Sequence, residues 1–264
     1  MPIHAINSLD DPLLEPYRNM KDRELARFDG RFIAEGENVV RRLLKSPIPV
    51  ESVLVAQRKA EAIAPLAKST TPVFSASDDL IQQVIGFEFH SGVLACGIRP
   101  DPVDLSVVVP PSPRRALIVV CQQITNTENL GSLIRLAAAF GANAMLLGES
   151  CCDPFFRQSV RVSMGTIFSV PMVRSENLLE DLDRLADLGV ETCATVLATD
   201  AEPLFSISPP NRVALVFGNE AQGLDEETIR HCRRRVTIPM QLGTDSLNVA
   251  MAAAVFLHHF TTPR

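Results

Sequence analysis

Short apolar runs that alternate with helical patterns constrain the fold of this chain more than any other feature. ALIVVC (116–121) and AMLLG (144–148) are uninterrupted apolar runs, as expected for strands buried on both faces of a sheet. The helical pattern LGSLIRLAAAFG lies between them, which predicts a βαβ unit. Further strand candidates lie at 191–197, 213–218 and 235–239. Helices are predicted near 176–188, near 225–232 and from Ser246 onward. This order predicts an α/β fold with a mostly parallel sheet covered by helices.

The first hundred residues repeat the alternation on a smaller scale. A helical stripe in ENVVRRLLK is followed by strand candidates at 51–56, 72–75 and 92–98, with helices near 58–67 and after Ser77. Between the two regions, residues 99–114 contain five prolines and little helical periodicity, as expected for a linker. We therefore predict a small α/β domain at 1–98, a Pro-rich linker at 99–114 and a second domain at 115–264.

The composition is that of an ordinary globular protein. Hydrophobic residues make up 46% and charged residues 21% of the chain. No run of about 18 apolar residues occurs, and the N-terminus has no basic segment followed by an apolar run. We therefore expect a cytoplasmic protein with no membrane partner. The six cysteines show no CxxC or Cys/His spacing, so we expect reduced thiols and no metal site.

The formal net charge of −6 argues against a nucleic-acid partner, because phosphate binding draws on a basic surface. It does not exclude one, since net charge says nothing about distribution. Local basic clusters are Arg114 with Arg115, Arg157 with Arg161, and Arg230 with Arg233, Arg234 and Arg235. Taken alone, a solvated surface is the simpler interpretation of each cluster.

Three segments share one order, which is a buried strand, a polar loop and the start of a helix. In a parallel sheet, ligands bind at the loops beyond the carboxyl ends of the strands. The loops to consider follow Val120, Leu197, Gly218 and Pro239. No Ser-His-Asp order, phosphate-binding loop, metal cluster or pair of catalytic carboxylates competes with them.

The first segment, QQITNTENLGSLIRLAAAFGA, contains Asn126 and Asn129 in or beside the loop and Arg135 on the helix. A helix start presents free N–H groups and the positive end of a dipole, which suits a phosphate or a developing oxyanion. An arginine buried in so apolar a helix would need a partner. The alternative is an asparagine cap with an arginine that points to solvent.

The second segment, VALVFGNEAQGLDEETI, has Gly218 and Gly223 on either side of Glu220. Glycines allow a backbone to approach a ligand closely, but the GxGxxG dinucleotide fingerprint is absent. A strand-to-helix turn capped by Asp225 would explain the same residues without a ligand.

The third segment, VTIPMQLGTDSLNVAMAAAVF, ends in a very apolar helix. Ser246 or Asp245 could simply cap this helix. Asn248 interrupts the apolar pattern in the first turn, where it is either a local hydrogen-bonding residue or a ligand contact.

Together these segments resemble the signature motifs of one family. NxxNxGxxxR followed by AxxFG, then FGNExxGL, then IPM with SLNVAxAxA, are similar to the three motifs of the SpoU/TrmH class of SPOUT methyltransferases, in their usual order and near their usual spacing. The resemblance covers 115–264 and includes RVSMGTIFSVP at 161–171. Less specifically, GRFIAEGENVVRRLL and FHSGVLACG resemble the start and end of the family's small RNA-recognition domain.

The resemblance implies a deep trefoil knot near the C-terminal end, a rare exception to the usual chain topology. It also implies that the knot loops bind S-adenosylmethionine, and that the protein is a homodimer with its active site near the subunit interface. The positions that match cofactor contacts of the family are Gly218, Ile238, Leu247, Leu197 and Met240. No metal or other cofactor is implied.

Arg135 matches the family arginine that activates a ribose 2′-hydroxyl. An arginine with a pKa above about 12 is a poor base, so we expect it to stabilise the developing alkoxide or the adjacent phosphate. A phosphate oxygen or water would then accept the proton. Asn129, Glu220, Ser246 and Asn248 match the other polar motif positions, and we expect them to position the ribose, Arg135 and the cofactor.

The expected activity is therefore methyl transfer from S-adenosylmethionine to a ribose 2′-hydroxyl of structured RNA. Ribosomal RNA is preferred slightly over transfer RNA, because N-terminal accessory domains are commoner among the ribosomal RNA enzymes and this acidic chain lacks a basic tail. One alternative is a catalytically silent RNA-binding protein, but no motif is broken at Arg135, Glu220 or Asn248. The other is a base-methylating SPOUT enzyme, which the SLNVA segment and Arg135 disfavour.

Overall fold

The computed structural model describes residues 3–18, 30–86 and 89–262. The chain forms two compact units, and it passes between them three times. Unit 1 comprises Met1–Asp101 with Asp153–Phe168, and unit 2 comprises Pro102–Cys152 with Ser169–Arg264. Residues 153–168 thus pack with the N-terminal region although they follow the first motif in sequence. The division into folding domains at 1–98 and 115–264 stays a prediction.

Unit 1 is built on a five-stranded sheet with the order β1–β4–β3–β5–β2, in which β5 runs antiparallel to both of its neighbours. Its strands are β1 (Ile3–Ala5), β2 (Arg31–Glu35), β3 (Val50–Ala56), β4 (Val73–Ala76) and β5 (Val93–Ile98). Its helices are η1 (Pro12–Tyr17), α2 (Glu37–Lys45), η2 (Gln57–Lys59), α3 (Ala60–Ile63), η3 (Ala64–Leu66), α4 (Asp78–Ile85), α7 (Arg157–Val162) and η4 (Thr166–Phe168). The strands at 51–56, 72–75 and 92–98 were predictable from apolar runs, and Ser77 caps α4 by accepting a hydrogen bond from the Leu80 N–H.

Aromatic packing and an ion pair hold residues 153–168 in unit 1. The Phe32 ring of β2 lies 5.0 Å from the Phe155 ring and 5.7 Å from the Phe168 ring, measured between centroids. Arg99 Nη2 lies 2.7 Å from Asp153 Oδ2, at the start of the segment. Helix α7 packs directly on β2.

Unit 2 contains a seven-stranded sheet, all of whose paired strands are parallel, with the order β10–β12–β9–β11–β6–β7–β8. Its strands are β6 (Ala116–Cys121), β7 (Ala144–Leu147), β8 (Met172–Arg174), β9 (Glu191–Thr195), β10 (Glu202–Pro203), β11 (Arg212–Phe217) and β12 (Arg234–Thr237). Its helices are α5 (Leu105–Val108), α6 (Thr127–Ala139), α8 (Leu178–Asp187), η5 (Leu204–Ser206), α9 (Glu226–His231) and α10 (Val249–Thr261). The predicted parallel α/β fold is confirmed.

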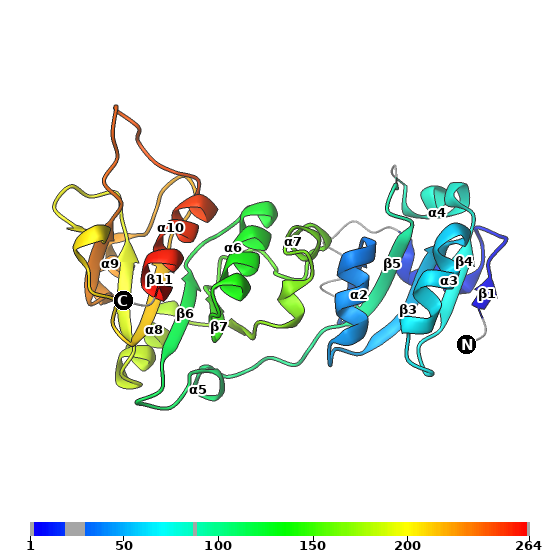
Figure 1. Ribbon diagram of the computed structural model, residues 1–264, viewed down its shortest axis with the longest axis horizontal. Coiled ribbons are helices and arrows are strands. Elements are labelled where there is room, and N and C mark those ends of the chain that lie inside the picture. Colours follow the sequence, from blue (N-terminus) through cyan, green and yellow to red (C-terminus); the bar gives the residue numbers. More distant parts are fainter. Residues whose placement is uncertain (1–2, 19–29, 87–88, 263–264) are drawn as a thin grey trace. The chain divides into compact units, whose positions relative to one another are not determined.

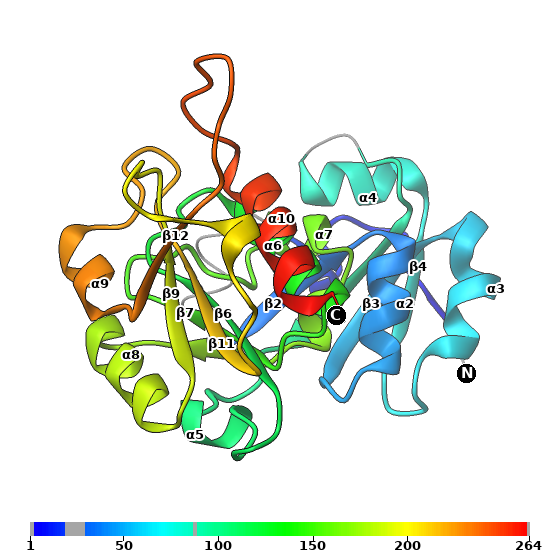
Figure 2. The same cartoon turned by 60° about the vertical axis from the view of Figure 1, so that its left-hand side comes forward.

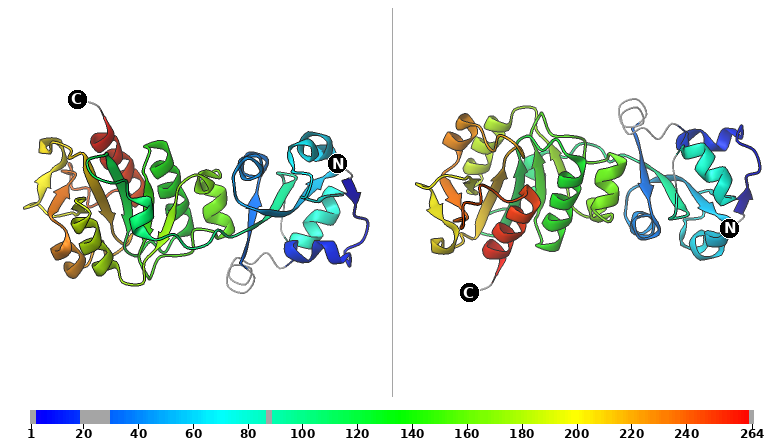
Figure 3. Two further views of the ribbon diagram at one scale, coloured as in Figure 1. Left: turned by 90° about the horizontal axis from the view of Figure 1, so that it is seen from below. Right: turned by 90° about the horizontal axis from the view of Figure 1, so that it is seen from above.

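Helices cover both faces of this sheet. Helices α6 and α10 lie against one face, and α8 and α9 lie against the other (Figures 1, 2 and 3). The predicted strands at 116–121, 144–148 and 213–218 form its centre, where every residue of β6, β7 and β11 is buried. The edge strands β8 and β10 were not predicted, because three and two residues are too few to show a periodicity.

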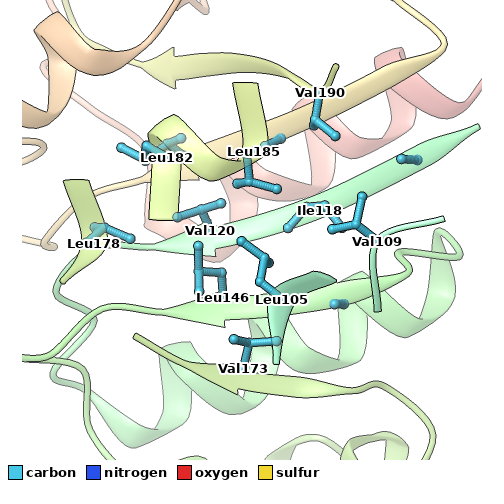
Figure 4. Packing of buried hydrophobic residues seen from close by; sticks show 14 of the residues in the cluster. Leu105, Val109, Ile118, Val120, Leu146, Val173, Leu178, Leu182, Leu185 and Val190 are labelled. Carbon is cyan, nitrogen blue, oxygen red and sulfur yellow. The ribbon is translucent and has the colours of Figure 1, made fainter. Parts of the chain in front are cut away.

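Part of the segment predicted to be a linker contributes to the core of unit 2. Leu105 and Val109 are buried beside Leu182 and Leu185 of α8 and Ile118 of β6 (Figure 4). Burial of aliphatic side chains stabilises a fold by roughly 1.5–3 kcal/mol each. The prolines of residues 99–114 therefore surround a short apolar anchor, which the proline content concealed in the sequence.

Arg212, the first residue of β11, holds the same segment to the sheet. Its guanidinium donates to the carbonyl oxygens of Pro110 at 2.8 Å, Arg114 at 2.6 Å and Leu188 at 3.0 Å. Only 8% of the residue is exposed, so little water competes for these carbonyls.

No helix in the described parts of the chain is long and apolar enough to cross a membrane.

We predict that Arg212→Met lowers the free energy of unfolding by about 3 kcal/mol, because three partly buried hydrogen bonds from a charged donor are lost. Urea unfolding followed by circular dichroism measures this change. Arg230→Met is the matched control, since Arg230 is exposed and should change stability by less than about 0.5 kcal/mol. Equal midpoints for wild type and Arg212→Met would contradict the assigned role.

Candidate active site

The loop after β6 is fixed at the start of α6 by an asparagine cap. Asn126 Oδ1 accepts hydrogen bonds from the backbone N–H groups of Glu128 at 2.8 Å and Asn129 at 3.2 Å. This is the usual arrangement of an N-cap, and it orients the first turn of the helix. Asn129 lies in that turn, next to the loop.

The Asn129 side chain joins all three motif segments. Its Nδ2 donates to Glu220 Oε1 at 3.0 Å, and its Oδ1 accepts from Asn248 Nδ2 at 3.0 Å. The partners lie 91 and 119 positions away in the sequence. Glu220 Oε1 also accepts from the Asn126 N–H at 3.3 Å. Because an amide has both a donor and an acceptor, Asn129 can join a carboxylate to a second amide.

Asn248 also begins the last helix. Its Oδ1 accepts from the Ala250 N–H at 2.9 Å, and it is the N-cap of α10. The prediction that this helix begins at Ser246, with Ser246 or Asp245 as cap, is wrong, because Asn248 provides the cap and the helical backbone starts at Val249. Ser246 and Leu247 therefore belong to the polar loop before the helix, which projects beyond the sheet (Figure 2).

The loop after β11 folds back on itself. The backbones of Asn219 and Gly223 exchange two hydrogen bonds of 2.9 Å. A Cβ atom at Gly218 would overlap the backbone of Gly223, so only glycine fits where the loop closes. Asn219 Nδ2 donates to the Gln123 carbonyl at 3.0 Å and thereby connects this loop to the loop after β6.

Gln122 makes a second connection between these two loops. Its Oε1 accepts from the Asp225 N–H at 3.2 Å, and its Nε2 donates to Asp225 Oδ2 and, at 2.8 Å, to Thr228 Oγ1. Burial raises the pKa of Asp225, but hydrogen bonds from the backbone and hydroxyl of Thr228 and from Gln122 outweigh it and hold the pKa below its usual value. Asp225 therefore caps α9 as a carboxylate.

The loop after β7 supports the loop after β6 from the other side. The Cys151 thiol donates to the Cys121 carbonyl at 3.1 Å and accepts from the Ile124 N–H at 3.3 Å. Burial raises the pKa of Cys151, so the group stays protonated. At Gly148 a Cβ atom would overlap the Gln122 carbonyl, which explains the glycine at the end of β7.

A pocket of about 520 Å³ lies beside the Asn129–Glu220–Asn248 chain. Its lining includes all five residues predicted to contact a cofactor, namely Leu197, Gly218, Ile238, Met240 and Leu247. Glu220, Ser246 and Asn248 also line it. Leu197 is 64% exposed and Leu247 is 37% exposed, so apolar surface is open to a ligand at this place. The pocket lies at the carboxyl ends of β9, β11 and β12, as parallel sheets require.

Two of the predicted catalytic residues do not line this pocket. Asn129 reaches it only through Glu220 and Asn248. Arg135 lies eight residues after Thr127, about 12 Å further along the axis of α6 at 1.5 Å per residue. Its side chain is exposed and has no hydrogen bond or ion pair with the described residues. The structure thus supports the interpretation that Arg135 faces solvent rather than a buried partner.

Two arginines of the basic cluster at Arg230–Arg235 pair closely with carboxylates. Arg234 Nε lies 2.7 Å from Glu191 Oε1, and Arg235 Nη2 lies 2.8 Å from Asp200 Oδ1. Arg233 also approaches Glu191, at 3.8 Å. These arginines are therefore engaged with carboxylates, as expected for a solvated surface.

Comparison with known proteins identifies the family. The family model described as the SpoU rRNA Methylase family matches residues 116–258, more than half of the chain. This chain belongs to the SpoU rRNA methylase family. As a SpoU enzyme it is an RNA methyltransferase, and the cofactor of the family is S-adenosylmethionine.

The similarity to individual relatives extends over nearly the whole length of this chain. A protein of Mycobacterium tuberculosis named as an uncharacterized tRNA/rRNA methyltransferase is 37% identical over 262 residues, which cover 96% of this chain and 89% of that protein. The 23S rRNA (guanosine(2553)-2′-O)-methyltransferase RlmP of Bacillus subtilis is 29% identical. The aligned region covers 96% of this chain and 98% of RlmP. The AdoMet-bound rRNA methyltransferase of Sinorhizobium meliloti superposes with a TM-score of 0.84 at 25% identity, over 98% of this chain and 97% of that one.

Several residues that connect the loops of this site were not predicted from the sequence. Gln122, Asn219 and Cys151 connect the loops, yet none of them was assigned a role. Asn219 lies inside FGNExxGL, so the motif held its signal. Gln122 and Cys151 carry no local pattern, because their partners are 103 and 27–30 positions away.

We predict that Asn129→Asp lowers the free energy of unfolding by about 1 kcal/mol, because it replaces an amide donor with a carboxylate that repels Glu220. The double variant Asn129→Asp/Glu220→Gln restores a donor opposite an acceptor and should recover more than half of the loss. Urea unfolding of the wild type, both single variants and the double variant measures this coupling. Simple addition of the two single effects would show that the pair does not interact.

We predict that Asp225 stabilises the fold in a pH-dependent way. The folded pKa lies below the unfolded value of about 3.9, so the contribution is full above that pH and is lost as pH falls through the folded pKa. Asn is also a good helix cap, so Asp225→Asn isolates the charge. The stability difference between wild type and Asp225→Asn should be constant from pH 5 to 7 and shrink below pH 4. A difference that persists unchanged at pH 3 would contradict the assigned ionisation.

Proposed function

We propose that the protein transfers a methyl group from S-adenosylmethionine to a ribose 2′-hydroxyl of RNA, with ribosomal RNA preferred over transfer RNA. The observation that carries the proposal is the pocket lined by Leu197, Gly218, Ile238, Met240 and Leu247, with the Asn129–Glu220–Asn248 chain at its edge. The Bacillus subtilis relative is named as a 2′-O-methyltransferase of 23S ribosomal RNA, which supports both the ribose and the ribosomal substrate.

The residues of the pocket fit the cofactor. A volume of about 520 Å³ lies within the range of small-molecule sites, and apolar side chains with a few polar groups form such sites in general. Leu197, Ile238 and Leu247 would surround apolar parts of the cofactor. S-adenosylmethionine supplies a methyl group on a positively charged sulfur, which makes the sulfur a good leaving group.

The protein has to orient the acceptor hydroxyl and stabilise the charge that develops on its oxygen. Arg135 fits the second role, because its guanidinium is permanently charged and its donors have no partner among the described residues. A phosphate oxygen or water then takes the proton. Asn129, Glu220, Ser246 and Asn248 fix the loops between which the ribose would lie.

We also infer a homodimer. Met251 and Val255 lie one turn apart on α10, and they are 65% and 44% exposed. Helix α10 packs beside α6, which carries Arg135. A second copy covering this apolar face would bring the partner close to Arg135, in agreement with an active site near the subunit interface. The trefoil knot and a cytoplasmic location stay predictions.

The alternative functions differ in their products. A silent RNA-binding protein would transfer no methyl group, and a base-methylating enzyme would label a base. Intact Arg135, Glu220 and Asn248 favour the ribose-methylating enzyme over both.

We predict that Arg135→Ala reduces methyl incorporation into total RNA at least 100-fold and leaves the affinity for S-adenosylmethionine within twofold of wild type. The reason is that Arg135 serves the acceptor and lies outside the lining of the pocket. Filter-binding of tritium-labelled RNA measures incorporation, and calorimetry measures cofactor affinity. Leu247→Arg is the complementary control, because charge in the pocket should remove cofactor binding. Full turnover by Arg135→Ala would refute the assignment.

A further inference from the structure

Two arginines of unit 1 are each balanced by a carboxylate of their own. Arg58 pairs with Asp78 at 2.9 Å, and Arg99 pairs with Asp153 at 2.7 Å. Such pairs leave little net charge for a polyanion. The surface formed by α2 and α7 is different, and we call it the α2–α7 face.

On the α2–α7 face, two carboxylates meet more cations than they can balance. The two helices carry five cations, which are Arg41, Arg42, Lys45, Arg157 and Arg161. The carboxylates are Glu35, at the end of β2, and Glu37, at the start of α2. Glu37 is engaged by Arg41 at 2.9 Å and by Lys59 at 2.7 Å, and Glu35 is engaged by Arg157 and by Arg161 at 3.5 Å.

Three of these cations remain available to a ligand. Lys45 is exposed and has no hydrogen bond or ion pair with the described residues. Arg42 is exposed and meets no carboxylate there; it donates only to a backbone carbonyl, that of Met164, at 2.6 Å. Arg161 is 55% exposed and shares Glu35 with Arg157, which is only 20% exposed. The buried carboxylate is therefore already satisfied by Arg157.

The turn after α7 brings these side chains onto one surface. Met164 and Gly165 both have positive φ, at 55° and 78°, and this turn packs against Arg42. A Cβ at Gly165 would lie 3.3 Å from Arg42 Cβ. The hydrogen bond from Arg42 to Met164 thus joins α2 to the C-terminal end of α7. Lys45 lies one turn after Arg42 on the same side of α2.

We propose that Arg42, Lys45 and Arg161 form a phosphate-binding surface that contacts the sugar–phosphate backbone of the substrate RNA, an inference that rests on the proposed function. Guanidinium and ammonium groups are the usual partners of backbone phosphates, and such contacts position a protein without reading sequence. The excess of positive charge is notable in a chain whose formal net charge is −6. It gives a polyanion one attractive surface on unit 1.

The residues of this surface come from two separate parts of the sequence. Arg42 and Lys45 come from the N-terminal region, whereas Arg161 comes from the stretch between the first and second motifs. The RNA-recognition unit would therefore include residues 153–168 in addition to the N-terminal region. Exchanging residues 1–98 alone would then not transfer the full affinity for RNA.

The test measures the salt dependence of binding to protein-free 23S ribosomal RNA by filter binding between 50 and 300 mM KCl. Each lost phosphate contact should reduce the slope of log K against log salt by about 0.7–0.9. The double variant Lys45→Ala/Arg161→Ala should therefore show a slope shallower by about 1.5 and an affinity about tenfold lower or more at 0.1 M salt. Arg157 still pairs with Glu35 in this variant, and cofactor affinity should be unchanged.

The matched control is Arg58→Ala/Arg235→Ala, which removes the same charge from two exposed arginines that each pair with a carboxylate, Asp78 at 2.9 Å and Asp200 at 2.8 Å. This control should keep the wild-type slope. The proposal is overturned if Lys45→Ala/Arg161→Ala keeps the wild-type slope. It is also overturned if the control double variant loses as much of the slope as Lys45→Ala/Arg161→Ala does. The single variant Lys45→Gln changes only one exposed residue at the end of α2, so it should fold like the wild type. It should lower the slope by about 0.7–0.9.

The same experiment separates this inference from the proposed function. If the wild type binds RNA through the α2–α7 face but methylates none, the surface stands and the proposed reaction fails. If the wild type methylates RNA and the variants bind and turn over like wild type, the reaction stands and the surface fails. A wild type that does not bind the RNA at all overturns the surface.

Discussion

The hydrogen bonds of the Asn129 side chain hold together three loops that lie far apart in the sequence. One amide group contacts both the Glu220 carboxylate and the Asn248 amide, because it carries a donor and an acceptor side by side. Both partners line the pocket, Glu220 from the loop after β11 and Asn248 from the loop after β12. The pocket is therefore as much a product of loop positioning as of the sheet beneath it.

Support for that arrangement comes from side chains that contact no ligand. Gln122 connects the loop after β6 to the cap of α9, and Cys151 holds the same loop from the opposite side. Gly148 and Gly218 permit backbone approaches that any side chain would prevent. A site that must align two reactants needs such support, because a displacement of about 1 Å can cost about two orders of magnitude in rate.

The sequence predicted the parts of this fold that depend on local pattern. The central strands β6, β7 and β11 were evident from buried apolar runs, and the motifs identified Glu220, Asn248 and the residues around the pocket. Long-range relations were not predictable. Nothing near residues 153–168 indicates that they pack with unit 1. The residues that hold this segment, Phe32 and Arg99, lie far from it in the sequence. The cap of α10 was misplaced, because Asp245, Ser246 and Asn248 are all good caps.

Transfer of a methyl group to a ribose oxygen is the central claim, and analysis of labelled nucleosides tests it most directly. The purified protein is incubated with tritiated S-adenosylmethionine and total RNA, the RNA is separated by size, and each labelled fraction is digested to nucleosides. We expect label in a 2′-O-methyl nucleoside from ribosomal RNA. Label in a methylated base, or no label although the protein binds the cofactor, would contradict it.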